Sequence, residues 1–219
     1  MSTVDLTGTP EGLGDFIVNA RNAVSSGART ILLPHKLRRY APLLDGVCAV
    51  EIKVDSPDGT FPKLMPHELD ECSAFKNPIC LKRYCAPAWA HLRQINQARW
   101  IPIVRRLLRD GYTVLDFGIS RDFKSLPINS ERYVPEVDLP LRAVAARLKK
   151  SGVYIGIDTG EMHLAFQVDC QMWVVRPDET PDYAYEDWGY KSDRVRYFNA
   201  NTPLETLYDS FSAARSRTA

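Results

Sequence analysis

The sequence predicts an α/β protein with two Rossmann-like lobes facing one another across a cleft, the first lobe being reduced. Apolar, β-branched runs alternate with amphipathic helical patterns, as in parallel, doubly wound sheets. This alternation is interrupted once, by a stretch rich in proline and cysteine, and then resumes. The 219 residues are enough to bury one sizeable core or two small ones. These observations favour two successive α/β halves.

The first lobe is expected within residues 1–55. A loop with several glycines, Thr7–Asp15, precedes its first helix, and Gly27 follows that helix as a stop signal. Within the helix, Phe16, Ile17 and Ala20 share one face, which is typical of an amphipathic helix. Strands are predicted at Thr3–Leu6, Ala28–Leu33 and Val47–Val54, and helices at Phe16–Ser25 and Leu37–Leu44.

Residues 56–91 break this rhythm, and we expect a long connecting loop with one or two short helices. Three of the five cysteines lie here, together with two histidines, which raises the question of a zinc site. The intervals between cysteines form no C-x-x-C pair that could start a tetrahedral site, so we expect buried or idle thiols and no metal. The residues concerned are His67, Cys72, Cys80, Cys85 and His91.

The second lobe is expected within residues 92–200, followed by a closing helix and tail in residues 201–219. Its helical patterns lie at Arg99–Arg109, Leu141–Lys150, Glu161–Val168 and Pro203–Arg215. Its strands are predicted at Tyr112–Phe117, Arg132–Val134, Val153–Ile157, Gln171–Val175 and Val195–Phe198.

Charge and composition give no sign of a nucleic-acid-binding or a membrane-spanning protein. The net charge is +1, so no bulk electrostatic field indicates nucleic acid or an anionic membrane as a partner. No uninterrupted apolar stretch approaches the roughly 20 residues that cross a bilayer, and the N-terminus lacks the pattern of a signal peptide. The odd number of cysteines suits a reducing compartment. We therefore expect a cytoplasmic protein without a membrane span.

The segment from Val153 to Leu164 carries the clearest sign of a ligand site. A buried strand stops at Asp158-Thr159-Gly160, and a helix follows. A strand, a tight turn and a helix aim backbone N–H groups and the positive helix end at an anion. Asp158 would lie at the carboxyl end of the strand, where open α/β sheets bind ligands. The alternative is an ordinary connection with a capped helix.

Several segments of the chain together resemble the ADP-heptose:lipopolysaccharide heptosyltransferases, which are GT-B-fold enzymes of glycosyltransferase family 9. The most specific is the D-T-G-x-x-H-L-A element from Asp158 to Ala165, and the G-D element at Gly14-Asp15 precedes it in the expected order. The segments that carry the resemblance are Gly12–Ile17, Leu32–Asp55, Ala98–Gly118 and Val137–Val175.

The resemblance implies roles for individual residues. Asp15 would be the catalytic base, in an acceptor-side loop with Gly12 and Gly14. The alternative for Asp15 is an N-cap of the helix at Phe16. Asp158 would hold the turn or bind the donor sugar or ribose. Thr159 and Gly160 would bind the donor diphosphate through their backbone amides, and His163 would reach the same phosphates. Ser120 and Asp122 would bind the nucleoside. A purely structural role is the alternative for His163.

Two departures from the family pattern bear on these roles. Ala98 stands where the family has a lysine that neutralises donor phosphate, and Arg99 or Arg93 is the candidate replacement, because a guanidinium can clamp phosphate. The short first lobe leaves the acceptor open: a glycan, a small metabolite, a protein side chain or a modified nucleic-acid base.

The sequence therefore favours a glycosyltransferase of the hexosyl or heptosyl type with a nucleotide-diphosphate sugar as donor. The resemblance implies an inverting, metal-independent reaction without a cofactor. Two alternatives stay open. One is a nucleotide-sugar epimerase on the same fold, and the other is a non-catalytic module that binds a nucleotide sugar or a partner.

Overall fold

The computed structural model describes residues 3–6, 12–28, 30–33, 35–44, 64, 66–70, 73–85, 95–177 and 192–216. The chain forms two compact units. Unit 1 comprises Met1–Ser73, Leu139–Lys150 and Thr159–Cys170, and unit 2 comprises Ala74–Asp138, Ser151–Asp158 and Gln171–Ala219. The predicted α/β class is confirmed.

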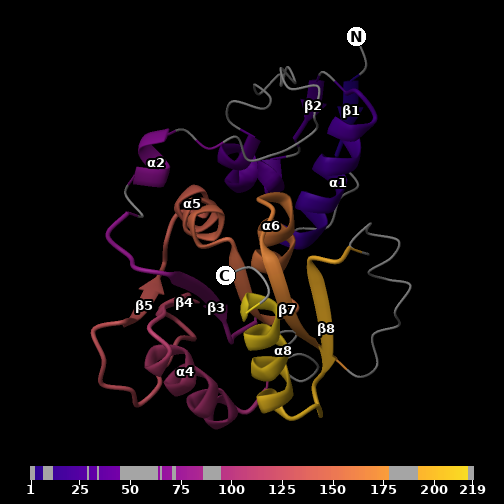
Figure 1. The fold of residues 1–219 in the computed structure, drawn as a ribbon. Coiled ribbons are helices and arrows are strands. Elements are labelled where there is room, and N and C mark those ends of the chain that lie inside the picture. Colours follow the sequence, from indigo (N-terminus) through magenta and orange to yellow (C-terminus); the bar gives the residue numbers. More distant parts are fainter. Residues whose placement is uncertain are drawn as a thin grey trace. The chain divides into compact units, whose positions relative to one another are not determined.

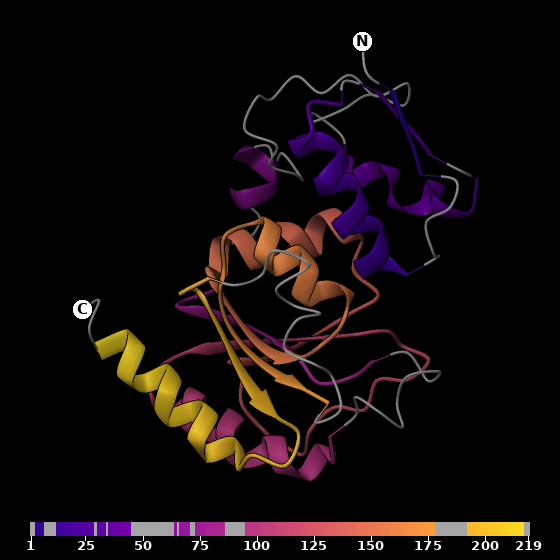
Figure 2. The same cartoon turned by 90° about the vertical axis from the view of Figure 1, so that its right-hand side faces the viewer.

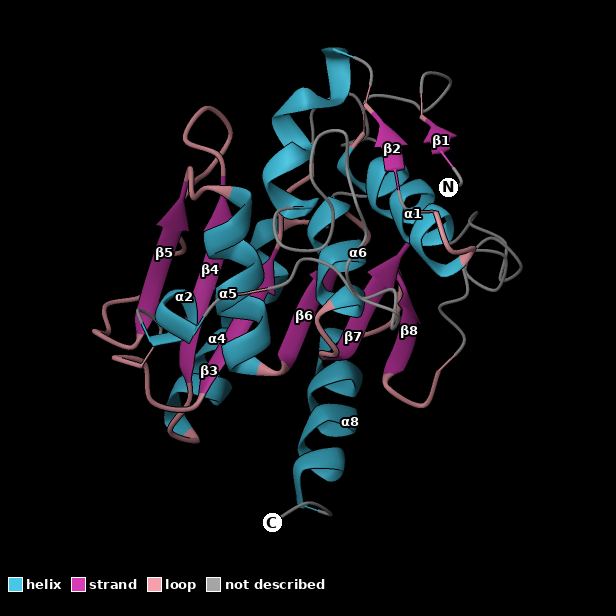
Figure 3. Cartoon of the chain, turned by 90° about the horizontal axis from the view of Figure 1, so that it is seen from above, coloured by secondary structure: helices cyan, strands magenta, loops and turns pink. Residues whose placement is uncertain are grey.

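Unit 2 is built on a six-stranded parallel sheet in the order β5-β4-β3-β6-β7-β8 (Figures 1 and 3). Because every pair is parallel, the carboxyl ends of all six strands lie at one edge of the sheet. The strands are β3 (Pro78–Lys82), β4 (Thr113–Gly118), β5 (Tyr133–Val137), β6 (Val153–Ile157), β7 (Gln171–Arg176) and β8 (Val195–Asn199).

Strand β3 corrects one expectation. It lies within residues 56–91, for which the sequence predicted a loop with short helices, yet it pairs with both β4 and β6. Cys80 and Leu81 are completely buried in it. Proline is tolerated as the first residue of a strand, where Pro78 stands. A run of only three apolar residues after a proline resembles a loop in sequence. In the structure these residues are buried and pair with a strand on each side.

Two helices pack against one face of this sheet and close the main core (Figure 2). They are α4 (Trp100–Arg109), which follows the short 3₁₀ turn η3 (Gln97–Arg99), and α8 (Leu204–Ser216). The apolar residues of α4 recur at helical spacing, so that they share one buried face. Trp100 from α4, Trp173 from β7 and Phe211 from α8 are among the fully buried side chains, each contributing about 1.5–3 kcal/mol or more.

Unit 1 contains a parallel pair of short strands and a group of helices. Helix α1 contacts α6 and η1, and the Phe16 and Tyr40 rings lie 5.2 Å apart. Arg142 of α5 forms a bidentate ion pair with Glu68 of α2, at 2.6 and 2.7 Å. The elements are β1 (Thr3–Asp5), α1 (Leu13–Ser25), β2 (Thr30–Leu32), η1 (His35–Leu44), α2 (Pro66–Asp70), most of α5 (Leu141–Ser151) and α6 (Gly160–Gln167).

Some sequence predictions fall outside the described residues: the strand Val47–Val54, and the side chains of Cys72, His91 and Arg93. Among the helices that the structure describes, none has the length and apolar character needed to span a membrane.

Candidate functional site

Asp15 lies in the first turn of α1, not before it. The helix begins at Leu13, and the Phe16 N–H donates to the Gly12 carbonyl at 3.0 Å. The N-cap is Gly12, so the alternative that Asp15 caps a helix starting at Phe16 is wrong. The Asp15 carboxylate is exposed and lies over Gly12, because a Cβ at Gly12 would come within 2.5 Å of Asp15 Oδ2. The missing side chain of Gly12 thus leaves room for the carboxylate.

Helix α6 begins directly after the turn that follows β6. Thr159 is its N-cap, with an extended backbone, and the Met162 N–H donates to the Thr159 carbonyl at 3.0 Å. The other amides of a first helical turn have no partner within the helix and can bind an anion. Gly160, the first helical residue, is half-buried. The predicted order of strand, turn and helix is confirmed, and phosphate binding by the turn stays a prediction.

The two glycine-containing motifs meet in unit 1, where α1 packs against α6. A Cβ at Gly14 would lie 2.6 Å from His163 Cδ2 and 2.7 Å from His163 Nε2. A Cβ at Gly160 would lie 2.8 Å from Leu13 Cβ. Each helix therefore has a glycine where the other approaches closely. Apart from Asp158, the motifs that the sequence assigned to opposite lobes belong to one compact unit.

This packing supplies a structural reason for two of the glycines. Gly160 accommodates the Leu13 side chain, and Gly14 accommodates the His163 ring. His163 is only 6% exposed and belongs to the buried face of α6. The presence of glycine in these turns is thus explained without a ligand. A role in binding phosphate rests on the backbone amides of the turn and on the positive end of the helix.

Asp158 closes strand β6 in unit 2 and is 1% exposed. Its N–H donates to the Val175 carbonyl at 3.1 Å, which continues the pairing with β7. Burial and then the negative charge of Asp158 raise the pKa of the Tyr197 phenol on β8. Of the two roles expected for Asp158, its burial favours holding the turn.

Ser120 and Asp122 lie in the loop that follows β4, at the carboxyl edge of the sheet. The Ser120 N–H donates to Asp138 Oδ1 at 2.9 Å, and the Ser120 hydroxyl and N–H lower the pKa of that carboxyl. Asp122 pairs with Arg121 at 3.1 Å. The loop folds back tightly, since a Cβ at Gly118 would come within 2.0 Å of the Phe123 ring. Their contact with a nucleoside stays a prediction.

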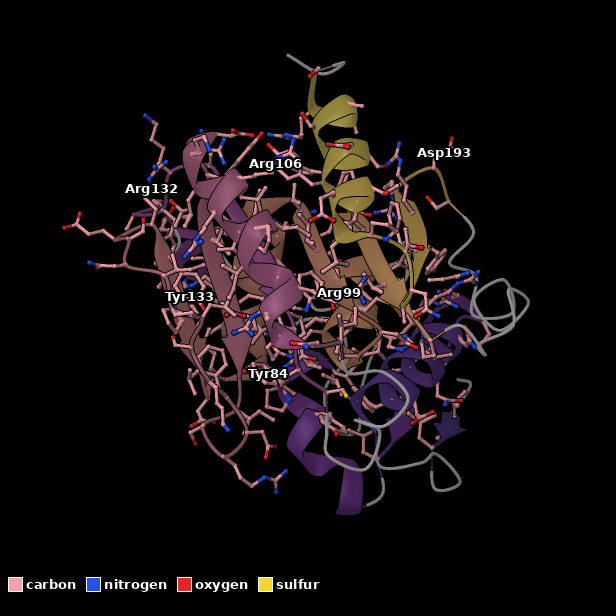
Figure 4. The ribbon with its side chains drawn as sticks, turned by 90° about the horizontal axis from the view of Figure 1, so that it is seen from below. Tyr84, Arg99, Arg106, Arg132, Tyr133 and Asp193 are labelled. Carbon is pink, nitrogen blue, oxygen red and sulfur yellow. The ribbon has the colours of Figure 1, made fainter. Side chains whose placement is uncertain are left out.

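Arg99 joins the start of α4 to the loop between β8 and α8 (Figure 4). Its Nη1 donates to the Ala200 carbonyl and its Nη2 to the Thr202 carbonyl, both at 2.8 Å. The guanidinium therefore holds the chain segment that leads into α8. Binding of a donor phosphate by Arg99 stays a prediction.

A buried ionic network at the end of β3 was missed by the sequence analysis. Arg83 and Asp116 form an ion pair with both side chains 0% exposed, and the closest N···O distance is 2.6 Å. Tyr133 donates to Asp116 Oδ2 at 2.5 Å. Burial disfavours the charged form of Arg83, but its hydrogen bonds and charge interaction with Asp116 outweigh this and raise its pKa. The sequence does carry one sign of this network: Asp116 lies inside the apolar run VLDF, and a buried carboxylate requires a partner.

This network fixes the loop that carries Ser120 and Asp122. Arg83 Nη2 and the Tyr84 hydroxyl both donate to the Lys124 carbonyl, at 3.1 and 2.8 Å. The Lys124 N–H donates back to the Tyr84 hydroxyl at 3.1 Å, and the Leu126 N–H donates to the Tyr133 hydroxyl at 3.1 Å. Residues at the end of β3 and on β5, the two strands that flank β4 in the sheet, thus hold one loop.

Among the described residues, no group of three or more histidine, cysteine or acidic side chains is placed to hold a metal ion. His67 is exposed on α2. Cys80 is buried and Cys85 half-buried, and neither forms a disulfide.

Comparison with known proteins agrees with the architecture. No protein-family model matches the chain, and no curated protein sequence matches it. Two solved structures share its arrangement of elements. The glycosyl transferase family 9 protein of Veillonella parvula DSM 2008 aligns over 96% of this chain and 74% of its own, with a TM-score of 0.52 and 14% identity. E. coli ADP-heptose LPS heptosyltransferase II aligns over 99% of this chain and 77% of its own, with a TM-score of 0.57 and 13% identity.

This chain has the fold of these glycosyltransferases. The resemblance inferred from the sequence motifs is therefore confirmed for the fold. At 13–14% identity the alignment supports the architecture, while the roles of single residues depend on the local geometry described above.

Proposed function

We propose that this protein is a glycosyltransferase that moves a sugar from a nucleotide-diphosphate donor to a hydroxyl group of an acceptor. The observation that carries the proposal is the packing of α1 on α6 through Gly14 and His163. It puts an exposed carboxylate, Asp15, and the N-terminus of a second helix into one compact unit. The fold shared with two glycosyltransferases supports the same class of reaction.

In the proposed reaction the acceptor oxygen attacks the anomeric carbon of the donor sugar while Asp15 takes the proton of the acceptor hydroxyl. The bond between the anomeric carbon and the diphosphate oxygen breaks, and its electron pair leaves with the nucleoside diphosphate. The first-turn amides of α6, at Thr159 and Gly160, and the imidazole of His163 stabilise the charge on the leaving diphosphate. A single direct displacement inverts the anomeric configuration.

The remaining site residues have supporting roles in this proposal. Asp158 holds the turn before α6, and Ser120 and Asp122 bind the nucleoside on a loop made rigid by Arg83. No step requires a metal or a cofactor, since helix dipole and backbone amides neutralise the leaving group. We propose the cytoplasm as the compartment, from the odd number of cysteines.

The experiment starts from donor binding. A thermal-shift series with nucleotide-diphosphate sugars identifies the donor, since a ligand that binds only the folded state raises Tm. Release of nucleoside diphosphate from that donor is then measured with candidate acceptors: glycans, small hydroxylated metabolites, peptides and modified oligonucleotides. We expect release only with one acceptor class.

The base assignment is tested with Asp15→Asn. Transfer should fall about 10²–10⁴-fold, while the donor still raises Tm as in wild type. Asp70→Asn, which changes another exposed carboxylate of unit 1, is the matched control and should transfer normally. Normal transfer by Asp15→Asn would refute the base. Recovery of an epimerised donor without an acceptor would identify an epimerase, and donor binding without any turnover would identify a binding module.

A further inference from the structure

A hollow of about 380 Å³ lies in unit 2 between the end of α4 and the loop before β5. Three arginines line it: Arg105 and Arg109 from α4, and Arg132 from the loop. β4 starts directly after α4, and β5 starts directly after Arg132, so the hollow lies at the amino ends of the strands. Figure 4 places Arg132 and Tyr84 at opposite ends of α4. The hollow is therefore separate from the residues at the carboxyl edge.

The positive charge in the hollow is not balanced by protein groups. All three arginines are exposed, and within the part of the chain that the structure describes their guanidinium groups make no hydrogen bond or ion pair. No acidic residue is among those that line the hollow, whose side chains carry a charge of +3 against a net charge of +1 for the whole chain. Of the acidic residues close to it in sequence or on the neighbouring helix, Asp110 accepts a hydrogen bond from Tyr208 and Asp209 pairs with Arg106, while Glu131 precedes Arg132 without lining the hollow.

Helix electrostatics alone do not account for this arrangement. A cation in the last turn of a helix is stabilised by the helix dipole, which accounts for Arg109. Arg105 lies one turn earlier on the same helix surface, and like charges at that spacing destabilise a helix by about 0.2–0.5 kcal/mol. Arg132 comes from a different segment and adds a third like charge. An anionic ligand would offset this repulsion.

The hollow is also held in a defined shape. The Val114 N–H donates to the Arg132 carbonyl at 2.7 Å, and the Tyr133 N–H donates to the Ser130 carbonyl at 3.0 Å. The Arg132 Nη1 atom would lie 3.9 Å from a Cβ at Gly111, which places this guanidinium beside the turn that follows Arg109. The three cations are thus presented by a fixed backbone.

The hollow also has apolar lining residues next to the main core. Leu108 is 6% exposed and belongs to that core, and Ile128 packs against it. Asn129 and Ser130 add hydrogen-bonding groups at the wall. We propose that this hollow binds a phosphate-bearing ligand, with the arginines on the phosphate oxygens and an apolar part of the ligand over Leu108 and Ile128. Guanidinium groups suit phosphate because their N–H donors match its oxygens in pairs.

Calorimetric titration with inorganic pyrophosphate tests the site. The double variant Arg109→Gln/Arg132→Gln should bind at least about tenfold more weakly than wild type. Arg215→Gln, which removes one positive charge from an exposed position of the same unit, is the control and should bind normally. The proposed donor site is left unchanged in every variant, so that its contribution to pyrophosphate binding is the same in all of them and the difference between variants reports the hollow. Thermal melting checks that each variant is folded.

The phosphate can belong to a soluble molecule or to a lipid headgroup, and a second measurement separates the two sources. The same variants are mixed with phosphatidylcholine vesicles that contain or lack phosphatidic acid. If the double variant loses pyrophosphate binding, the result supports a soluble ligand. If it loses only its retention on vesicles that contain phosphatidic acid, the result supports a lipid headgroup. The proposal is overturned if the double variant matches the control with both probes.

Discussion

The α-carbon of Gly14 lies directly against the imidazole of His163, so close that a methyl group on it would come within 2.6 Å of Cδ2. This contact joins the first turn of α1 to the first turns of α6. Two motifs that are almost 150 positions apart in the sequence are thus neighbours, and the position of each depends on the other.

Gly14→Ala should destabilise unit 1. In an exposed helix the same change stabilises by about 0.5–1 kcal/mol, because glycine costs more conformational entropy. Here the methyl group must displace a buried ring, so we expect a loss of about 1–3 kcal/mol in the free energy of unfolding. Urea unfolding measures it. The double variant Gly14→Ala/His163→Ala should recover most of the loss, whereas purely additive effects would show that the two residues do not touch.

Gly12→Ala should affect Asp15 and not the fold. The backbone of Gly12 (φ −69°, ψ 144°) is one that alanine adopts readily, but its Cβ would lie 2.5 Å from Asp15 Oδ2. The flexible carboxylate will rotate away, so we expect stability within about 0.5 kcal/mol of wild type and a clear fall in sugar transfer. In the Asp15→Asn background, Gly12→Ala should cause no further loss of activity. A further loss would mean that Gly12 acts independently of the carboxylate.

Breaking the ion pair of Arg83 and Asp116 should be costly. Arg83→Met leaves an uncompensated buried carboxylate, and we expect about 3–5 kcal/mol of destabilisation in denaturant unfolding. Arg83→Met/Asp116→Leu should be less destabilised than the single variant, because neither charge then remains buried alone. The exposed pair of Arg106 and Asp209 is the comparison, and Asp209→Asn should cost less than about 1 kcal/mol. Equal effects at both pairs would contradict this view of the network.

Tyr133 should make the fold sensitive to alkaline pH. Burial, and then the charge and hydrogen bond of Asp116, raise the pKa of its phenol to about 12. The folded-state pKa thus lies above the unfolded value of about 10, so the protonated phenol stabilises the fold fully below pH 10. This contribution, about 2–3 kcal/mol, is lost as the pH rises from about 10 to about 12.

Urea unfolding of wild type and Tyr133→Phe across this interval checks the prediction. The variant should be less stable at neutral pH, because it lacks the hydrogen bonds to Asp116 and Leu126. Between pH 10 and 12 it should lose less stability than wild type does. Parallel curves for the two proteins would show that the Tyr133 phenol ionises equally in the folded and unfolded chains.

Elements with a long apolar pattern could be predicted from sequence. Helix α4 and strands β4, β6 and β7 lie within a residue or two of the expected bounds, because α4 repeats its apolar residues at helical spacing and the strands are mostly apolar runs of five or six buried or partly buried residues. Strand β3 could not, because three apolar residues after Pro78 are too short a run to indicate a strand. The start of α1 was placed three residues late, since Gly12 and Gly14 are poor helix formers and only their contacts show why they are there.

The candidate site was predictable only in part. The order of the two motifs could be predicted from the sequence, and so could the turn at Thr159 and Gly160. The contact between Gly14 and His163 could not, because it depends on how the side chains of α1 and α6 fit together. Arg83 and Asp116, which lie 33 residues apart, likewise become a pair only when β3 and β4 are adjacent.

Unit 1 takes its residues from three separate stretches of the chain, and the intervening stretches belong to unit 2. A gene fragment ending at Ser73 would therefore encode α1 without α6, leaving Phe16 and Ile17 on a helix that has lost its neighbour. Such a fragment would expose apolar surface and aggregate. Exchange of either unit for that of another protein would need crossovers at several points, because neither unit is one contiguous segment of the chain.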